Sequence, residues 1–313
     1  MRRLGLTTIL LVSSSGCLPL SQPPITVDRY DALQNNQGFI QVVTGNGAAC
    51  ATDQDGLTSC WGEELQDQGP FEVPDQELVY LESSLGPEAT FCGITTANRL
   101  ECWGRSDAPK SLVLASPTDQ PEWFDLAVGD QHACALDDHG QLYCWGDDGQ
   151  GQLDVPDAAF LMVDAAGDLS CGLDAALQVR CWGGGEAIPL WIENAVGTTA
   201  WDLILGQSYL CLGEPDDDLW YYTCFTEETP QGSVLPAMGL VDESTGGDHH
   251  LCVLHDRHVV SCSGDDSQDQ LAIQDEDVPW IHVSAGVGAT CGVHGVGSIY
   301  CYGDIPGPQE GTP

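Results

Sequence analysis

Apolar and polar positions alternate in short segments that recur along the chain. Between Trp123 and Gly146, the apolar residues Phe124, Leu126 and Val128 stand at every second position. The same alternation is found near both ends of the chain, at Ile40, Val42, Ile281, Val283 and Ala285. A period of two over five or six residues predicts a β-strand.

Paired cysteines recur in step with these strands. Fourteen of the fifteen cysteines form seven pairs, and six of the pairs are ten residues apart. The sequence pairs Cys50 with Cys60, Cys92 with Cys102, Cys134 with Cys144, Cys171 with Cys181, Cys211 with Cys224, Cys252 with Cys262, and Cys291 with Cys301. A repeat of roughly forty residues is typical of tandem repeat architectures. Because no two cysteines form a C-x-x-C motif, disulfides are favoured over a zinc or redox site.

The spacing within a pair predicts a hairpin. If Cys134 faces Cys144 on antiparallel strands, then Asp138, His139 and Gly140 form a three-residue loop, whose third residue is normally left-handed. The equivalent residues are Gly56, Asn98, Gly140, Leu177, His258 and Gly297. Leu177 is the least suited to that conformation. Directly opposed residues are close enough for a disulfide, so we predict one disulfide within each hairpin.

The repeats together predict an all-β, seven-bladed β-propeller with one disulfide-linked hairpin per blade. Ring closure removes the exposed strand edges that a linear array would leave. We expect a propeller over residues 39–305, with repeats that start near 39, 80, 123, 160, 201, 240 and 280, and a flexible tail over 306–313. Because the last repeat stops soon after Gly303, we also expect residues 22–38 to supply a ring-closing strand.

The N-terminus has the order of an export signal. Arg2 and Arg3 precede an apolar run, which small residues and Cys17 follow. This order resembles a bacterial lipoprotein signal, although Ser14 stands where an aliphatic residue is usual, and an ordinary cleaved signal is the alternative. We therefore expect a signal peptide over 1–16, lipidation of Cys17, a tether over 17–38, and an exported protein anchored to the bacterial cell envelope at the outer membrane. Disulfides persist in that compartment.

The charge of the chain narrows the range of partners. It has 48 acidic residues against 8 lysines and arginines, and a formal net charge of -40. Nucleic acid is excluded as a partner because its binding needs a basic surface. Anionic membranes are disfavoured for the same reason, so membrane contact is expected through the lipid only. The chain is 42% hydrophobic and can bury a core, which places the charge on the surface.

Further repeated motifs point to a family. A glycine stands five residues before the first cysteine in five repeats, and Trp-Gly follows the second cysteine in four. Gly129–His132 and Gly247–His250 both spell G-x-x-H, and residues 151–153 spell G-Q-L. Over about residues 39–304, the chain resembles the regulator of chromosome condensation repeat family in its cysteine-paired, exported bacterial form, which includes a β-lactamase inhibitory protein. The resemblance implies a seven-bladed propeller that serves as a protein-binding platform.

No catalytic motif accompanies these repeats. The sequence contains no H-E-x-x-H, no G-x-S-x-G and no Walker loop. We therefore expect a non-enzymatic protein without catalytic residues or cofactor, acting as a monomer. A lyase or hydrolase with a site at the channel mouth is the enzymatic alternative.

Two groups of residues raise the possibility of metal binding. His249, His250, His255 and His258 lie close in sequence, but alternation along a strand sends the first two to opposite faces, so we predict no metal site there. Calcium remains open, because acidic clusters offer oxygen ligands. They are Asp147–Asp148, Asp216–Asp218, Asp265–Asp266 and Asp275–Asp277.

The aromatic residues raise a carbohydrate-binding alternative. Most tryptophans recur at fixed repeat positions, as packing between blades requires, whereas Trp191 and Trp220 do not. Repeat five also has three extra residues between its cysteines. We therefore predict a binding loop there for an unknown protein or glycan, formed by Asp216, Asp217, Asp218, Trp220, Tyr221 and Tyr222.

Overall fold

A computed structural model describes residues 38–62, 77–86, 89–104, 122–185, 188–216, 219–236, 241–275 and 279–304. The predicted signal peptide, Cys17, the tether and nearly all of the ring-closing strand lie outside these ranges, as does the tail over 306–313.

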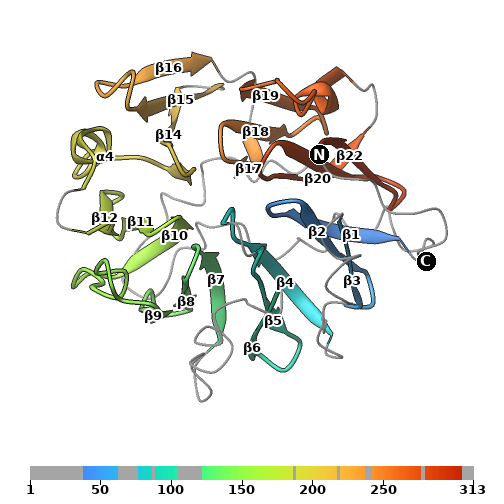
Figure 1. The fold of residues 1–313 in the computed structure, drawn as a ribbon, viewed down its shortest axis with the longest axis horizontal. Coiled ribbons are helices and arrows are strands. Elements are labelled where there is room, and N and C mark those ends of the chain that lie inside the picture. Colours follow the sequence, from blue (N-terminus) through green and yellow to red (C-terminus); the bar gives the residue numbers. More distant parts are fainter. Residues whose placement is uncertain are drawn as a thin grey trace.

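Seven antiparallel sheets stand around a common axis, which confirms the seven-bladed propeller (Figure 1). Blade one consists of β1 (Phe39–Thr44), β2 (Ala48–Asp53) and β3 (Thr58–Gly62). Blade two consists of β4 (Leu78–Ser83), β5 (Phe91–Thr95) and β6 (Leu100–Trp103). Blade three consists of β7 (Trp123–Val128), β8 (His132–Asp137) and β9 (Leu142–Gly146). Blades four and five are β10 (Phe160–Ala166), β11 (Leu169–Asp174) and β12 (Val179–Gly183); β13 (Asp202–Leu205), β14 (Tyr209–Asp216), β15 (Leu219–Thr226) and β16 (Ser233–Pro236). Blades six and seven are β17 (Val241–Gly246), β18 (His250–His255) and β19 (Val260–Gly264); β20 (Trp280–Ala285), β21 (Ala289–His294) and β22 (Ile299–Gly303).

Within the described residues, two short helices accompany the sheets. They are α4 (Leu190–Ala195) and the 3-10 helix η2 (Ala272–Asp275). No helix within the described residues has the length and apolar character needed to cross a membrane. Trp191 of α4 is buried in a core cluster, so it packs rather than presenting a ligand surface.

Every blade contains the predicted disulfide. The two cysteines lie opposite each other on the second and third strands, with Cα atoms 4.0 to 4.1 Å apart. The bonds join Cys50 to Cys60, Cys92 to Cys102, Cys134 to Cys144, Cys171 to Cys181, Cys211 to Cys224, Cys252 to Cys262, and Cys291 to Cys301. The first cysteine of each pair is buried, whereas five of the second cysteines are half-buried: Cys60, Cys144, Cys181, Cys262 and Cys301. The repeat spacing thus predicted all seven pairings.

The hairpin turns also have the predicted conformation. The third loop residue has a positive φ in all six hairpins of standard length, including 82° at Gly140 and 60° at Leu177. Loop length therefore determines the backbone at this position even where the residue is not glycine.

The hydrophobic core lies between neighbouring blades. Val43 of blade one packs in the same cluster as Leu81 and Phe91 of blade two. Tryptophans that follow the second cysteine belong to these layers; Trp182 of blade four, for example, lies in one cluster with Leu136 and Leu142 of blade three. Each blade therefore buries its apolar surface against the next one around the ring.

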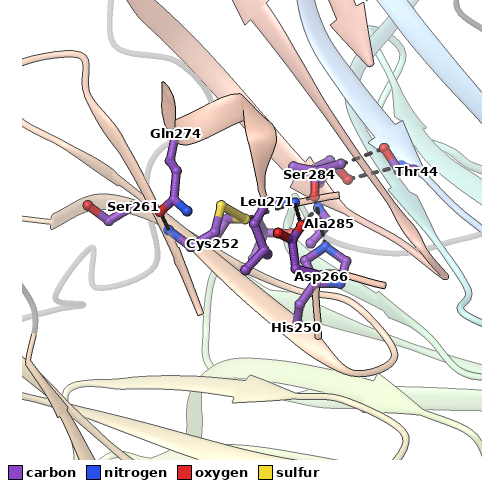
Figure 2. Close-up of a disulfide and its surroundings, with 12 residues drawn as sticks. Thr44, His250, Cys252, Ser261, Asp266, Leu271, Gln274, Ser284 and Ala285 are labelled. Atoms are coloured by element: carbon purple, nitrogen blue, oxygen red, sulfur yellow. Dashed lines mark hydrogen bonds between the residues drawn. A yellow bond between two sulfur atoms is a disulfide. The ribbon is translucent and has the colours of Figure 1, made fainter. Parts of the chain in front are cut away.

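Blade seven closes the ring directly against blade one. The Thr44 amide donates to Ser284 Oγ at 2.9 Å, across 240 residues of sequence, and Val42 packs with Ala289 and Val293. Figure 1 shows β1 beside β20, and Figure 2 shows the Thr44–Ser284 contact. Contacts of β1 with β20 and β21 thus join the two ends of the ring within the described part of the chain.

Candidate functional site: an acidic central cavity

The first strand of each blade faces the propeller axis, and together these inner strands enclose a cavity of about 440 Å³. Every inner strand contributes to its wall, and Trp220 of β15 adds to it from blade five. The cavity gathers residues that lie far apart in the sequence, from Gln41 to Ala285.

A β-bulge sets which side chains line the cavity. Six of the seven inner strands shift register within their first three residues, as β7 does between Trp123 and Asp125. A bulge re-aims the side chain that follows it. One level of the wall consists of the residues after the bulges together with Asp202 of β13: Gln41, Tyr80, Asp125, Met162, Asp202, Glu243 and His282. Two residues further along, Glu82 and Asp164 also reach the cavity.

The wall carries a large excess of negative charge. Its carboxylates are Glu82, Asp125, Asp164, Asp202, Asp242 and Glu243. Among the described residues that line the cavity there is no lysine or arginine, and His282 is the one basic side chain. The site is thus suited to cations and disfavours anions.

Two of the carboxylates join neighbouring blades. Asp125 accepts hydrogen bonds from the amide of Leu126 in its own strand, at 2.9 Å, and from that of Val163 in blade four, at 3.1 Å. Asp164 repeats the arrangement, accepting from Ala165 and from Leu205 of blade five, both at 2.8 Å. These side chains therefore have a structural role in addition to their charge.

Burial changes the protonation of this wall. Loss of solvation raises the pKa of Asp125 to about 6, that of Asp164 to about 7 and that of Glu82 to about 8. The neighbouring carboxylates add to the shift of Asp164 and Glu82, while the backbone hydrogen bonds oppose it. The cavity consequently holds protons at neutral pH.

Three hydrogen-bonded side chains from blades five and six form one side of the cavity wall. Asp202 Oδ2 accepts a hydrogen bond from the Tyr222 hydroxyl at 2.5 Å and from Ser244 Oγ at 2.6 Å. Tyr222 is buried, so it supports the cavity wall and is not a surface residue of the predicted binding loop.

Glu243 and His282 form an ion pair between blades six and seven. His282 Nδ1 lies 2.5 Å from Glu243 Oε1, and its Nε2 lies 2.8 Å from the carbonyl oxygen of Val42. Because a carbonyl only accepts, Nε2 donates, and the first contact requires one proton between Nδ1 and Oε1. The other oxygen, Oε2 of Glu243, is buried and has no hydrogen-bond partner in the described part of the chain.

The two ends of the cavity differ. At the end where the inner strands finish, Gln207 Nε2 of blade five donates to the Leu85 carbonyl of blade two at 2.9 Å, which spans the axis. At the end where they begin, Val79 is 45% exposed and the half-buried aromatic rings of Phe124 and Trp201 line the wall. The cavity therefore opens on the side where the inner strands begin.

The structure separates the residues of the predicted binding loop. Asp216 pairs with Leu219 near the tip of a lengthened hairpin, while Trp220 lies in the cavity wall and Tyr221 is half-buried beside it in sequence. Asp217 and Asp218 lie outside the described residues. The extra residues of repeat five lengthen β14 and β15, and in that blade a fourth strand, β16, pairs with β15.

The carboxylates of the cavity were not predicted from the sequence, although several of them stand at the same position in their repeats. Nine residues before the first cysteine, five inner strands carry a carboxylate, amide or imidazole side chain, and in four of them, all but β17, the neighbouring residues are mostly apolar. These residues are Gln41, Asp125, Asp202, Glu243 and His282. A polar residue that recurs at one position of an apolar strand indicates that this side of the strand does not face the hydrophobic core.

The four histidines between positions 249 and 258 do not converge. His250 is buried and pairs its Nε2 with Thr290 Oγ1 of blade seven at 2.7 Å; burial lowers its pKa to about 4. His255 contacts Ser261, and His258 occupies the left-handed turn with its Nδ1 near the Trp280 carbonyl. In the described part of the chain, the cluster with metal-ligand spacing is Asp137, Asp138 and His139, in a hairpin turn where Asp137 is buried and the other two are exposed.

Two of the acidic clusters considered for calcium binding form hydrogen bonds within their own loops. Residues 146–153 and 264–271 share the pattern G-D-D-x-Q-x-Q-L. Asp148 accepts from the Leu153 amide at 3.0 Å, and Asp266 accepts from that of Leu271 at 2.9 Å (Figure 2). Hydrogen bonding within each loop accounts for these carboxylates, and calcium binding stays an untested alternative.

Comparison with known proteins agrees with this architecture. Residues 125–152, which span the inner strand and hairpin of blade three, match the regulator of chromosome condensation (RCC1) repeat. One repeat of the chain thus matches the RCC1 repeat, within a seven-bladed propeller fold. Pim1 of Schizosaccharomyces pombe is 28% identical over 185 residues, which cover 56% of this chain and 31% of that protein. The chain thus spans about a third of the length of this curated relative.

Solved structures share the fold at low identity. Human WBSCR16 superposes with a TM-score of 0.63 at 13% identity, covering 80% of this chain and 85% of that one. The ectodomain of the Physcomitrella patens receptor kinase CR4 gives 0.61 at 22% identity, covering 84% and 73%. Prp20p of Saccharomyces cerevisiae gives 0.58 at 12% identity, covering 86% and 82%, and was described together with its binding to Gsp1p and histones.

Proposed function

We propose that this propeller is a non-enzymatic binding protein of the bacterial cell envelope, and that it docks a partner protein at the open end of its central cavity. The observation that carries the proposal is the cavity itself, which is acidic, lined in part by aromatic residues and bordered by the exposed Val79. Binding of Gsp1p and histones by Prp20p, which shares the fold, supports a protein partner.

The hydrogen bonds of the wall support binding rather than turnover. Both oxygens of Asp125 and of Asp164 accept backbone amides, and Asp202 accepts two hydroxyl groups. A general acid or base needs to reach a substrate proton at hydrogen-bond distance. Carboxylates that are already engaged in this way are better suited to fixing the shape and charge of a site.

A glycan is the second candidate ligand. The half-buried rings of Trp201 and Trp220 line the same cavity and offer surfaces for stacking. Competition by neutral oligosaccharides for the cavity, with no effect from proteins or peptides, would favour this alternative.

Site-specific photocrosslinking tests the docking proposal. A benzophenone amino acid at Val79 reports on the open end, and the same probe at the exposed His249, in the loop before β18, reports on the opposite end. With envelope extract of the source cells, we expect a defined protein adduct from position 79 and none from position 249. Equal adducts at both positions, or none at position 79, would contradict docking at the cavity.

A further inference from the structure

We propose that the cavity receives a single cationic side chain, a lysine or an arginine, from the docked partner. The inference rests on the proposed function and specifies the chemistry of the contact at the same site. Four features of the cavity carry it: its charge, its aromatic wall, the spacing of its oxygens and an unpaired carboxylate oxygen.

Charge is the first feature. Six carboxylates from five inner strands face one cavity that lacks lysine and arginine among its described lining residues, and His282 is already paired with Glu243. Ionised carboxylates held together in a poorly solvated space repel one another. A cation in the cavity relieves this repulsion, so the site gains free energy from a cationic guest that a neutral one does not supply.

The aromatic wall selects for an organic cation. Tyr80, Phe124 and Trp220 come from three different strands, Trp201 directly precedes β13, and all four line the cavity together with the carboxylates. Lysine and arginine carry a cationic head on an apolar stem, and both attract the faces of aromatic rings. The mixture of rings and carboxylates therefore matches both parts of such a side chain.

Spacing argues against a small metal ion. Calcium needs several oxygens within about 2.3 to 2.6 Å of one centre. In the described part of the chain, three acidic or histidine ligand atoms lie within 4.8 Å of one another only at Asp137, Asp138 and His139, which are outside the cavity. The cavity carboxylates are thus too dispersed for a compact ion, whereas an ammonium or guanidinium group on a stem can contact them over a larger distance.

Glu243 supplies a specific contact for the guest. Its Oε1 is used by His282, but its buried Oε2 has no donor within the described residues. A buried acceptor without a partner costs free energy, which a ligand donor recovers once the carboxylate turns Oε2 toward the cavity. Lysine and arginine heads consist entirely of donors, whereas the amide head of glutamine also has an acceptor that this site does not need.

Binding should be linked to proton release. The titratable groups that face the cavity are Tyr80, Glu82, Asp125, Asp164, Asp202, Asp242, Glu243 and His282. A bound cation favours the ionised form of the carboxyls whose pKa burial has raised, so Asp125, Asp164 and Glu82 lose protons on binding. The affinity for a cation should therefore increase from pH 5 to pH 8.

Three blocked pentapeptides test the inference. Acetyl-Gly-Gly-X-Gly-Gly-amide, with X as lysine, arginine or glutamine, is titrated into the propeller by isothermal calorimetry at low salt. We expect the lysine or arginine peptide to bind at least about tenfold more tightly than the glutamine peptide, with proton release. The two cationic peptides identify which head group is preferred. Equal binding of all three, or calcium binding in the cavity that displaces them, would overturn the inference.

Matched variants locate the contact. Glu243→Gln should weaken the cationic peptide about tenfold, and Trp220→Leu should weaken it without any change of charge. Asp157→Asn removes one exposed charge between β9 and β10 and should leave binding unchanged. Circular dichroism and melting curves establish that each variant is folded. If Val79 still gives its crosslink while no cationic peptide binds, the docking proposal stands and the cation inference is wrong.

Discussion

Leu177 adopts a backbone conformation that leucine seldom takes. Its φ is 60°, in the hairpin position where three other blades have glycine. Its amide donates to the Asp174 carbonyl at 2.7 Å, and the Asp174 side chain accepts from Ala176 and Gln178. The turn thus constrains the residue despite a cost of roughly 1 to 2 kcal/mol for a left-handed L-residue.

Replacing this leucine should stabilise the protein. Leu177→Gly removes the strain, and the greater freedom of glycine in the unfolded chain offsets part of the gain. We expect a net increase of about 0.5 to 1 kcal/mol in the free energy of unfolding, measured by chemical denaturation. Asn98→Gly, at the same position of blade two, should gain less because asparagine tolerates this region. A loss of stability in Leu177→Gly would show that its side-chain packing outweighs the strain.

At the scale of elements, the G-x-x-H motif is explained by a close contact between a turn and a ring. Gly129 lies directly against the imidazole of His132, whose Nε2 contacts Ser170 Oγ of the next blade at 2.7 Å. Gly247 and His250 repeat the arrangement toward Thr290. In blade five, Gly206 lies against Tyr209, whose hydroxyl donates to the His250 carbonyl. The glycine makes room for a ring that joins adjacent blades.

A side chain at this glycine should therefore be costly. In Gly129→Ala the new Cβ would collide with the His132 ring and lie 2.9 Å from the Gly167 carbonyl oxygen, so we expect a loss of about 1 to 3 kcal/mol. Gly149→Ala, at an exposed glycine with no such contact to the backbone, serves as the control. Adding His132→Ser to Gly129→Ala should recover part of the loss in a double-mutant cycle. Strictly additive effects would contradict the ring contact as the cause.

The irregular sequence of repeat five forms a hairpin that is longer than those of the other blades. Three additional residues between Cys211 and Cys224 lengthen the hairpin, so that β14 and β15 pair from Tyr209–Thr226 to Asp216–Leu219. The sequence indicated an irregular blade but could not show that Trp220 and Tyr222 turn toward the channel. Their direction depends on the register of the longer strands and on the position of Asp202 in the neighbouring strand.

On the scale of the whole molecule, ring closure concentrates charge on the axis. Each inner strand contributes a few polar side chains, and seven strands bring them into one cavity. The pKa of Glu82, raised to about 8, follows from this arrangement because burial and neighbouring carboxylates both disfavour its ionised form.

This shift makes stability depend on pH. The folded-state pKa of Glu82 lies above its ordinary value of 4.5, so its contribution to stability is complete below pH 4.5 and is lost as the pH rises to about 8. Glu82→Gln should match the natural protein at pH 4 and become progressively more stable than it up to pH 8, by at most about 1.4 kcal/mol per pH unit. Urea denaturation across this range measures the effect.

The exposed Glu77, which directly precedes β4, provides the control. Glu77→Gln should leave the pH dependence of stability unchanged. Parallel stability curves for Glu82→Gln and the natural protein would show that Glu82 titrates normally in the folded state.

Strand alternation, loop length and cysteine spacing are local properties within one repeat, so the blade count, the hairpins, the left-handed turn residues and the seven disulfides could be predicted from the sequence. The sequence also has polar residues at the same position of several repeats, as at Asp125, Asp202 and Glu243, but it did not show that they face a cavity. The arrangement of the blades in space was needed to show that these side chains share one cavity, that Gln207 spans one end of it, and that Tyr222 supports its wall. Those contacts join residues as much as 122 positions apart, and they exist only once the blades are arranged around a closed ring.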